Sequence, residues 1–163
     1  MKQMLAQYAA YNAWANKLLT DIIVDMPDEQ VKREIVSSFP SLYKTLLHLW
    51  DVESIWWQRM KLQDVVTWPS ESFKGTLLEL IQAFHSQSRQ WKEWIDLSTE
   101  AALQHEFIYK NSKRDQFKQP VYETIMHLFN HQTHHRGQLI TMLRQSGIKQ
   151  IPITDLIAFL RKK

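Results

Sequence analysis

The sequence contains no cysteine. A disulfide framework, a thiolate metal site and a cysteine nucleophile are therefore excluded. Any bound metal ion would need ligands from histidine, carboxylate or carbonyl groups. The absence of cysteine also fits a cytoplasmic protein, which is the location we expect.

Glycine is scarce, with three residues in a chain of 163. A β-sandwich or barrel needs many turns and usually more glycine, so this composition favours long helices. Long apolar runs are also missing, and none approaches the roughly 20 residues that would span a bilayer. The first residues lack the apolar core of a signal peptide. We therefore expect a protein that is neither secreted nor inserted in a membrane, with one domain over residues 1–163.

The chain also lacks a strong net charge. Its 20 basic residues are spread among 17 acidic ones, which gives a net charge of +3. This mild excess argues against a nucleic-acid partner. The densest basic stretch lies in a polar, turn-like segment, which favours a solvated loop over a phosphate-binding patch. Its members are Lys110, Lys113, Arg114 and Lys118.

Apolar residues recur at helical spacing in four long segments, about residues 2–25, 41–61, 73–97 and 120–147. A short fifth helix is expected over residues 154–161. Between the third and fourth segments the helical period fails, and residues 106–110 have strand-like composition before a turn-like stretch. The pattern predicts an all-α four-helix bundle, with a hairpin or extended crossover before the fourth helix and a short helix at the end.

The expected buried face of the first helix contains Met4, Tyr8, Tyr11, Trp14 (or Ala15), Leu18 and Ile22. The second helix is rich in tryptophan, at Trp50, Trp56 and Trp57. Packing in the core or in a dimer is favoured there over stacking on a ligand.

Four of the seven histidines lie within nine residues of the fourth predicted helix, at His127, His131, His134 and His135. A helix turns 100° per residue, so His135 lies about 20° to 40° and His131 about 80° from the centre of the apolar stripe. The other two point further outward. His131 and His135 are one turn apart and side by side, a spacing that lets two imidazoles bind one ion.

A third ligand must come from another helix. His48 is the only histidine on the second predicted helix, and it borders the apolar stripe there. Facing helices commonly build metal sites in bundles. His127 is an alternative partner, which we interpret instead as a supporting or surface group. The spacing alone favours a metal site no more than hydrogen-bonding, interface or pH-sensitive histidines.

The remaining histidines are interpreted as surface or hydrogen-bonded residues: His134 as solvated, His85 as a hydrogen-bonded residue at a helix edge, and His105 as exposed. No glutamate follows His131 directly, so the metalloprotease pattern is absent.

The segment from His127 to Gln138, which contains Asn130-His131 and His135-Arg136-Gly137, resembles the signature helix of the DinB/YfiT-like superfamily. Residues 11–18, 45–53 and 152–156 are similar to that family's first helix, second helix and closing turn. The resemblance implies a four-helix bundle, often a homodimer, with a divalent metal ion held by His48, His131 and His135. Zinc or nickel is expected first, with iron, cobalt or manganese as alternatives.

The resemblance further implies a metal-dependent enzyme, either a transferase that uses a low-molecular-weight thiol or a hydrolase, acting on a small molecule. The alternative is a non-catalytic dimeric bundle of the stress response that binds a metal or a ligand. A carboxylate from Asp51 or Glu53 that closed the metal site would favour this alternative. A DNA-binding module fits the dispersed charge poorly.

Four residues are candidates for supporting the site: Glu53, Asn130, Arg136 and Gln138. For Arg136 we favour a salt bridge at the surface or across subunits over binding of an acidic substrate. Individual roles for these residues and for His127 are not fixed by the sequence.

Overall fold

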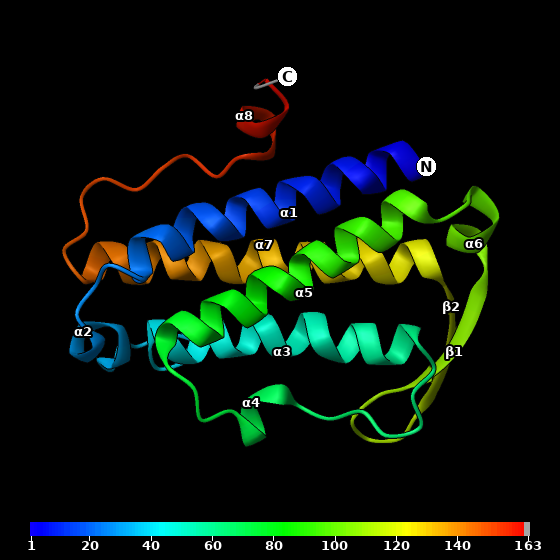
Figure 1. The fold of residues 1–163 in the computed structure, drawn as a ribbon, viewed down its shortest axis with the longest axis horizontal. Helices are drawn as coiled ribbons and strands as arrows, with labels where there is room; N and C mark the ends of the chain where they lie inside the picture. Colours follow the sequence, from blue (N-terminus) through cyan, green and yellow to red (C-terminus); the bar gives the residue numbers. More distant parts are fainter. Residues whose placement is uncertain (162–163) are drawn as a thin grey trace.

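The computed structural model describes residues 1–161, and four long helices make up most of it (Figure 1). They are α1 (Lys2–Ile23), α3 (Leu42–Met60), α5 (Leu77–Leu97) and α7 (Val121–Gln145). Four short helices connect or follow them: α2 (Asp28–Lys32), α4 (Pro69–Ser72), α6 (Glu100–Gln104) and α8 (Leu156–Leu160). Strands β1 (Glu106–Lys110) and β2 (Gln116–Pro120) form an antiparallel hairpin directly before α7. The predicted bundle, hairpin and closing helix are confirmed.

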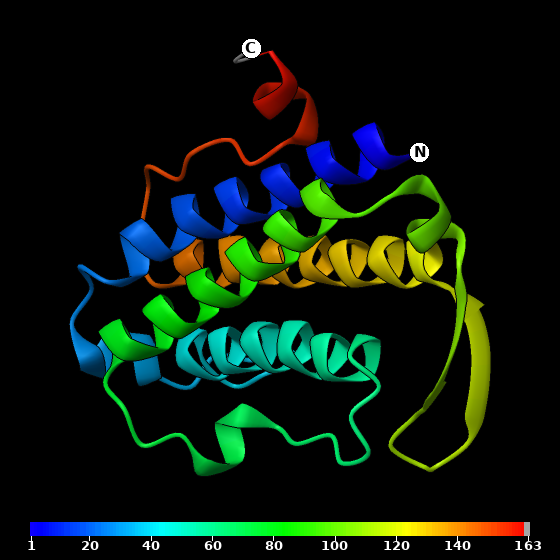
Figure 2. The ribbon, with the colours of Figure 1, turned by 45° about the vertical axis from the view of Figure 1, so that its right-hand side comes forward.

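The long helices pack as a bundle in which α1 and α3 each contact both α5 and α7. Helices α3 and α7 run in opposite directions, as both views show (Figures 1 and 2). The hairpin lies at the end of the bundle where α3 finishes and α7 begins. This antiparallel pairing brings the middle of α3 beside the middle of α7.

Local hydrogen bonds explain where two helices begin. The Ser41 hydroxyl accepts a hydrogen bond from the backbone of Lys44 and caps α3. Thr76 and Glu79 form a reciprocal capping box, so α5 begins at Leu77 and not near residue 73 as the sequence predicted.

The short helices differ from the sequence-based expectation. Helix α6 occupies part of the segment in which no helix was predicted, and α2 and α4 were not predicted either. Each spans five residues or fewer, which is too short to show a helical period.

In the predicted stripe of α1, Tyr11 and the alternative Ala15 are buried as expected, but the rest of the buried face is displaced by about one residue. Met4 is 57% exposed, whereas Leu5 is fully buried. The displacement arises because polar side chains occupy the buried face, at Asn12, Asn16 and Thr20. A pattern based on hydrophobicity alone does not count such residues as core.

The tryptophans of α3 pack within the chain. Trp56 is buried against Tyr109 of the hairpin, and Trp57 packs edge-on against Trp91 of α5. Within residues 1–161 we find no helix whose length and apolar character would suit a membrane span.

Candidate metal centre

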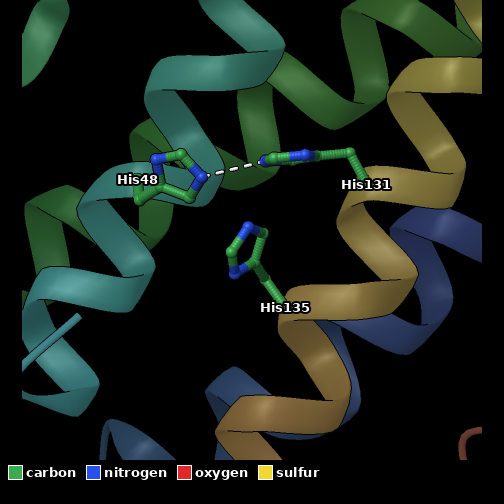
Figure 3. Close-up of side chains that lie close together, drawn as sticks. All are labelled: His48, His131 and His135. Atoms are coloured by element: carbon green, nitrogen blue, oxygen red, sulfur yellow. Dashed lines mark hydrogen bonds between the residues drawn. The ribbon is translucent and has the colours of Figure 1, made fainter. Parts of the chain in front are cut away.

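Three imidazole rings meet between α3 and α7. His48 projects from α3, and His131 and His135 project from successive turns of α7 toward it (Figure 3). One nitrogen from each ring lies within 4.8 Å of the others. The Nε2 atoms of His48 and His131 are 2.9 Å apart, so one of these nitrogens donates a hydrogen bond to the other. The structure therefore brings together the three predicted residues.

A buried glutamine fixes the relative position of the two helices at this point. Gln132 is fully buried, and its Nε2 donates a hydrogen bond of 2.8 Å to the backbone carbonyl of Leu49. These two residues are the immediate neighbours of His131 and His48. The bond therefore holds α7 in the register that places the two rings opposite each other.

Gln138 fixes the orientation of the third ring. Its amide nitrogen donates to the hydroxyl of Ser38 at 2.8 Å, which leaves its Oε1 to accept a hydrogen bond from Nδ1 of His135 at 2.7 Å. With the proton held on Nδ1, the Nε2 lone pair of His135 is available to a ligand. Of the four candidate supporting residues, Gln138 is thus the one that contacts a histidine of the cluster.

Burial keeps the three rings neutral. Desolvation, followed by the neighbouring His135 and His131 rings, lowers the pKa of His48 to about 3. Desolvation and the rings of His135, His127 and His134 lower the pKa of His131 to about 4. The pKa of His135 is lowered mainly by desolvation, against the effect of Gln138. Neutral imidazoles carry the lone pairs that a metal ion needs.

The donor set fits a divalent ion. Tetrahedral coordination at about 2.05 Å per nitrogen separates the ligand atoms by about 3.3 Å. The 2.9 Å pair and the 4.8 Å limit of the cluster lie on either side of that value. Among the described residues no carboxylate joins the three rings. Three imidazoles without a fourth protein ligand are the pattern of a site that keeps positions open.

Both carboxylates that could have closed the site are bound elsewhere. Asp51 accepts hydrogen bonds from the backbone nitrogen and the hydroxyl of Ser70. Glu53 accepts hydrogen bonds from Asn12 and Ser88 in the centre of the bundle. Neither one belongs to the histidine cluster.

An aromatic ring that the sequence analysis did not identify covers one side of the cluster. Phe39 stacks on His48 with ring centroids 4.1 Å apart, and its centroid lies 5.5 Å from that of His135. It belongs to the segment between α2 and α3, outside any regular element. Because this segment has no period, only the tertiary structure shows that Phe39 lies at the site.

Comparison of this chain with known proteins finds similarity to the DinB family. The model of the DinB family matches residues 1–162. The chain belongs to the DinB family. It is 27% identical to Protein DinB of Bacillus subtilis (strain 168) over 147 residues, which cover 87% of this chain and 86% of that protein.

Two solved structures share the DinB-like fold. A DinB-like protein from Bacillus cereus ATCC 10987 has a TM-score of 0.71 at 19% identity, covering 91% of this chain and 94% of that one. A DinB-like protein from Bacillus subtilis has a TM-score of 0.67 at 13% identity, covering 91% of this chain and 98% of that one.

The DinB-like motif also supplies a buried polar network, and here one prediction was wrong. Arg136 is not at the surface, because only 2% of it is exposed. Its Nη1 donates to the side-chain oxygens of Asn12 at 2.6 Å and Asn16 at 2.9 Å. The amide nitrogens of these asparagines donate in turn to Glu53. A buried cation and a buried carboxyl group are thus linked through two asparagines.

This network joins all four long helices. Ser88 of α5 donates to Glu53 of α3, while the two asparagines lie on α1 and Arg136 lies on α7. Desolvation raises the pKa of Glu53 to about 7, although the hydrogen bonds from Asn12 and Ser88 and the charge of Arg136 lower it. The network therefore links the four long helices to one another, and Arg136 is not part of the histidine cluster.

The remaining histidines lie where the sequence analysis predicted. His127 and His134 are exposed, with ring centroids 6.1 Å from His131 and 4.9 Å from His135 respectively. His85 is hydrogen-bonded to the hydroxyl of Thr20 at 2.8 Å. His105 and Asn130 are exposed.

Proposed function

We propose that this DinB-family chain binds one divalent metal ion through His48, His131 and His135 and acts as a metal-dependent enzyme. The reaction we propose is a transfer to or from a low-molecular-weight thiol, or a hydrolysis, of a small-molecule substrate. The convergence of three neutral imidazoles without a carboxylate from the described residues supports the proposal. A closed structural site would instead hold a fourth protein ligand.

A divalent ion in this position would act as a Lewis acid toward a thiol or water. The chain itself orients the donors. Gln138 holds the proton of His135 on Nδ1, and Phe39 shields the face of His48 from water. Because the chain has no cysteine, a thiol would have to enter as a cosubstrate.

The metal content of the purified protein tests the first half of the proposal. The protein is prepared without nickel-affinity chromatography, and bound metal per chain is measured by elemental mass spectrometry. We expect near-stoichiometric metal, with zinc or nickel first, and its loss in His135→Ala. His105→Ala removes an exposed histidine of the hairpin region and should keep the metal. No metal in the wild-type protein after incubation with zinc, nickel and manganese would exclude the site.

Activity assays test the second half. The metal-loaded protein is offered a panel of small thiols with an electrophilic acceptor, and separately a panel of chromogenic esters and amides. Turnover that requires the metal and is lost in His135→Ala supports an enzyme. A stoichiometric metal ion with no turnover in either panel would favour the non-catalytic bundle.

Three further properties stay predictions: a single domain over residues 1–163, a homodimer as the family resemblance implies, and a cytoplasmic location. Light scattering of the purified protein measures the oligomeric state directly. A monomeric mass would remove the homodimer from the proposal without affecting the metal site.

A further inference from the structure

Arg59, near the end of α3, has no hydrogen-bonding partner for its buried Nε atom. Its guanidinium packs over the rings of Trp56, at 4.7 Å, and Tyr109, at 5.8 Å. No acidic side chain in residues 1–161 forms an ion pair with it. Burying part of a cation without an acceptor is unfavourable. The two terminal nitrogens of the guanidinium also have no hydrogen-bonding partner among the described residues, and they are the donors suited to a carboxylate or phosphate.

A cavity of about 460 Å³ opens beside this guanidinium. Its walls come from the end of α3, the loop that follows α3 and the turn of the hairpin, which lie at one end of the bundle (Figure 1). The volume is in the range of small-molecule pockets. The cavity is therefore large enough for a small organic anion.

The charge of the cavity is mostly positive. Lys110 and Arg114 line it together with Arg59, and Asp64 is the single acidic residue among its lining residues. Both additional cations belong to the basic stretch for which the sequence favoured a solvated loop. They are exposed, but the fold turns them toward the same cavity as a partly buried arginine. Trp68 adds an aromatic wall.

We propose that this cavity binds the anionic group of a small molecule, with Arg59 as the principal ligand and Lys110 and Arg114 as supporting cations. The shared chemistry of its ligands is a carboxylate or a phosphate group. The site is separate from the three histidines and does not depend on a metal ion there.

The cavity nevertheless lies on the side of α3 that carries the histidines. Arg59 follows His48 by eleven residues, which places it about 20° away around the helix and about 16 Å along it. Rings connect the two regions, because Trp56 packs against His127, and His127 against His131. An anion at Arg59 would thus occupy the same face of the α3–α7 pair as the histidine cluster.

The test observes the Nε–H group of Arg59 directly by nuclear magnetic resonance. Sodium phosphate and, separately, sodium acetate are titrated against sodium chloride at equal ionic strength. The protein is first freed of metal by chelation and then desalted, so that neither a metal ion nor a chelator competes for the probe. We expect the Arg59 signal, assigned by its absence from Arg59→Lys, to shift saturably with phosphate or acetate and not with chloride. The tighter of the two probes identifies the preferred anion.

Variants separate a specific site from general attraction. Arg59→Gln should weaken binding of the tighter probe by about tenfold or more, as expected for lost hydrogen bonds to a charged group. Arg144→Gln removes an equal charge from an exposed position on α7 and should change the affinity by less than about twofold, because exposed charges are screened. Equal effects of both variants, or a chloride shift as large as the phosphate shift, would refute the proposal.

Circular dichroism checks that Arg59→Gln is folded. If it is not, a double variant with Lys110→Gln and Arg114→Gln replaces it, since both side chains are exposed and do not support the core. That double variant should weaken binding several-fold, and unchanged affinity would refute the proposal.

Discussion

The Glu53→Gln variant tests whether desolvation or the nearby Arg136 cation has the larger effect on the pKa of the buried Glu53 carboxyl group. Glu53 is fully buried and accepts hydrogen bonds from Asn12 and Ser88, with Arg136 on the far side of the asparagines. Burial favours the neutral acid, whereas the donors and the cation favour the carboxylate. Desolvation has the larger effect and raises the pKa of Glu53 from 4.5 to about 7.

The sign of the effect on stability follows from proton binding. Between pH 4.5 and 7 the folded protein holds a proton on Glu53 that the unfolded chain has lost, so the free energy of unfolding falls as the pH rises. At 1.36 kcal/mol for each pH unit, the raised pKa corresponds to roughly 3 kcal/mol lost across this interval. Glutamine is neutral at every pH, so Glu53→Gln avoids this loss.

The assay is urea unfolding of the wild-type protein and Glu53→Gln at several pH values from 4.5 to 8. Taking the difference between the two proteins cancels the other titrating groups, among them the buried histidines. We expect the stability of Glu53→Gln relative to the wild type to increase by roughly 3 kcal/mol as the pH rises. A difference that does not increase with pH across this range would show that the pKa of Glu53 is not raised in the folded protein, which would refute the reasoning.

Three further predictions concern other positions. Arg136→Met should reduce the free energy of unfolding by about 3–5 kcal/mol in urea unfolding, because it leaves buried acceptors and Glu53 without their cation; a loss under about 1 kcal/mol would contradict this. Gln138→Ala should weaken metal binding about 10- to 100-fold in a competition titration, while Gln145→Ala, an exposed glutamine of the same helix, should not. Thr76→Ala should cost about 1 kcal/mol of stability by removing the cap of α5, and an equal cost from Ser86→Ala on the exposed side of α5 would argue against a capping effect.

Much of the site could be predicted because its signals are local. Two histidines one turn apart on a helix must be neighbours whatever the tertiary fold. The helical angles also correctly separated the buried His135 and half-buried His131 from the exposed His127 and His134. His48 could be predicted as the third ligand because it borders the apolar stripe of α3, and facing helices in a bundle meet along such borders. The strand composition of residues 106–110 likewise located the hairpin.

Apart from the short helices and the start of α5, the predictions that failed concern buried polar residues. Arg136 was expected at the surface because arginine is usually exposed. Its burial depends on Asn12, Asn16 and Glu53, which lie far away in the sequence and come together only when the bundle forms. The same asparagines displaced the buried face of α1 from the hydrophobic pattern.

The sequence by itself determined the four long helices, the hairpin and the pair of histidines on α7, because each depends on spacing within one segment. Only the tertiary structure placed Phe39 on His48, Gln132 against Leu49, Arg136 in the core, and Arg59 beside the cations of the hairpin. These contacts join residues from different elements. They depend on how the helices pack against one another, which no local period encodes.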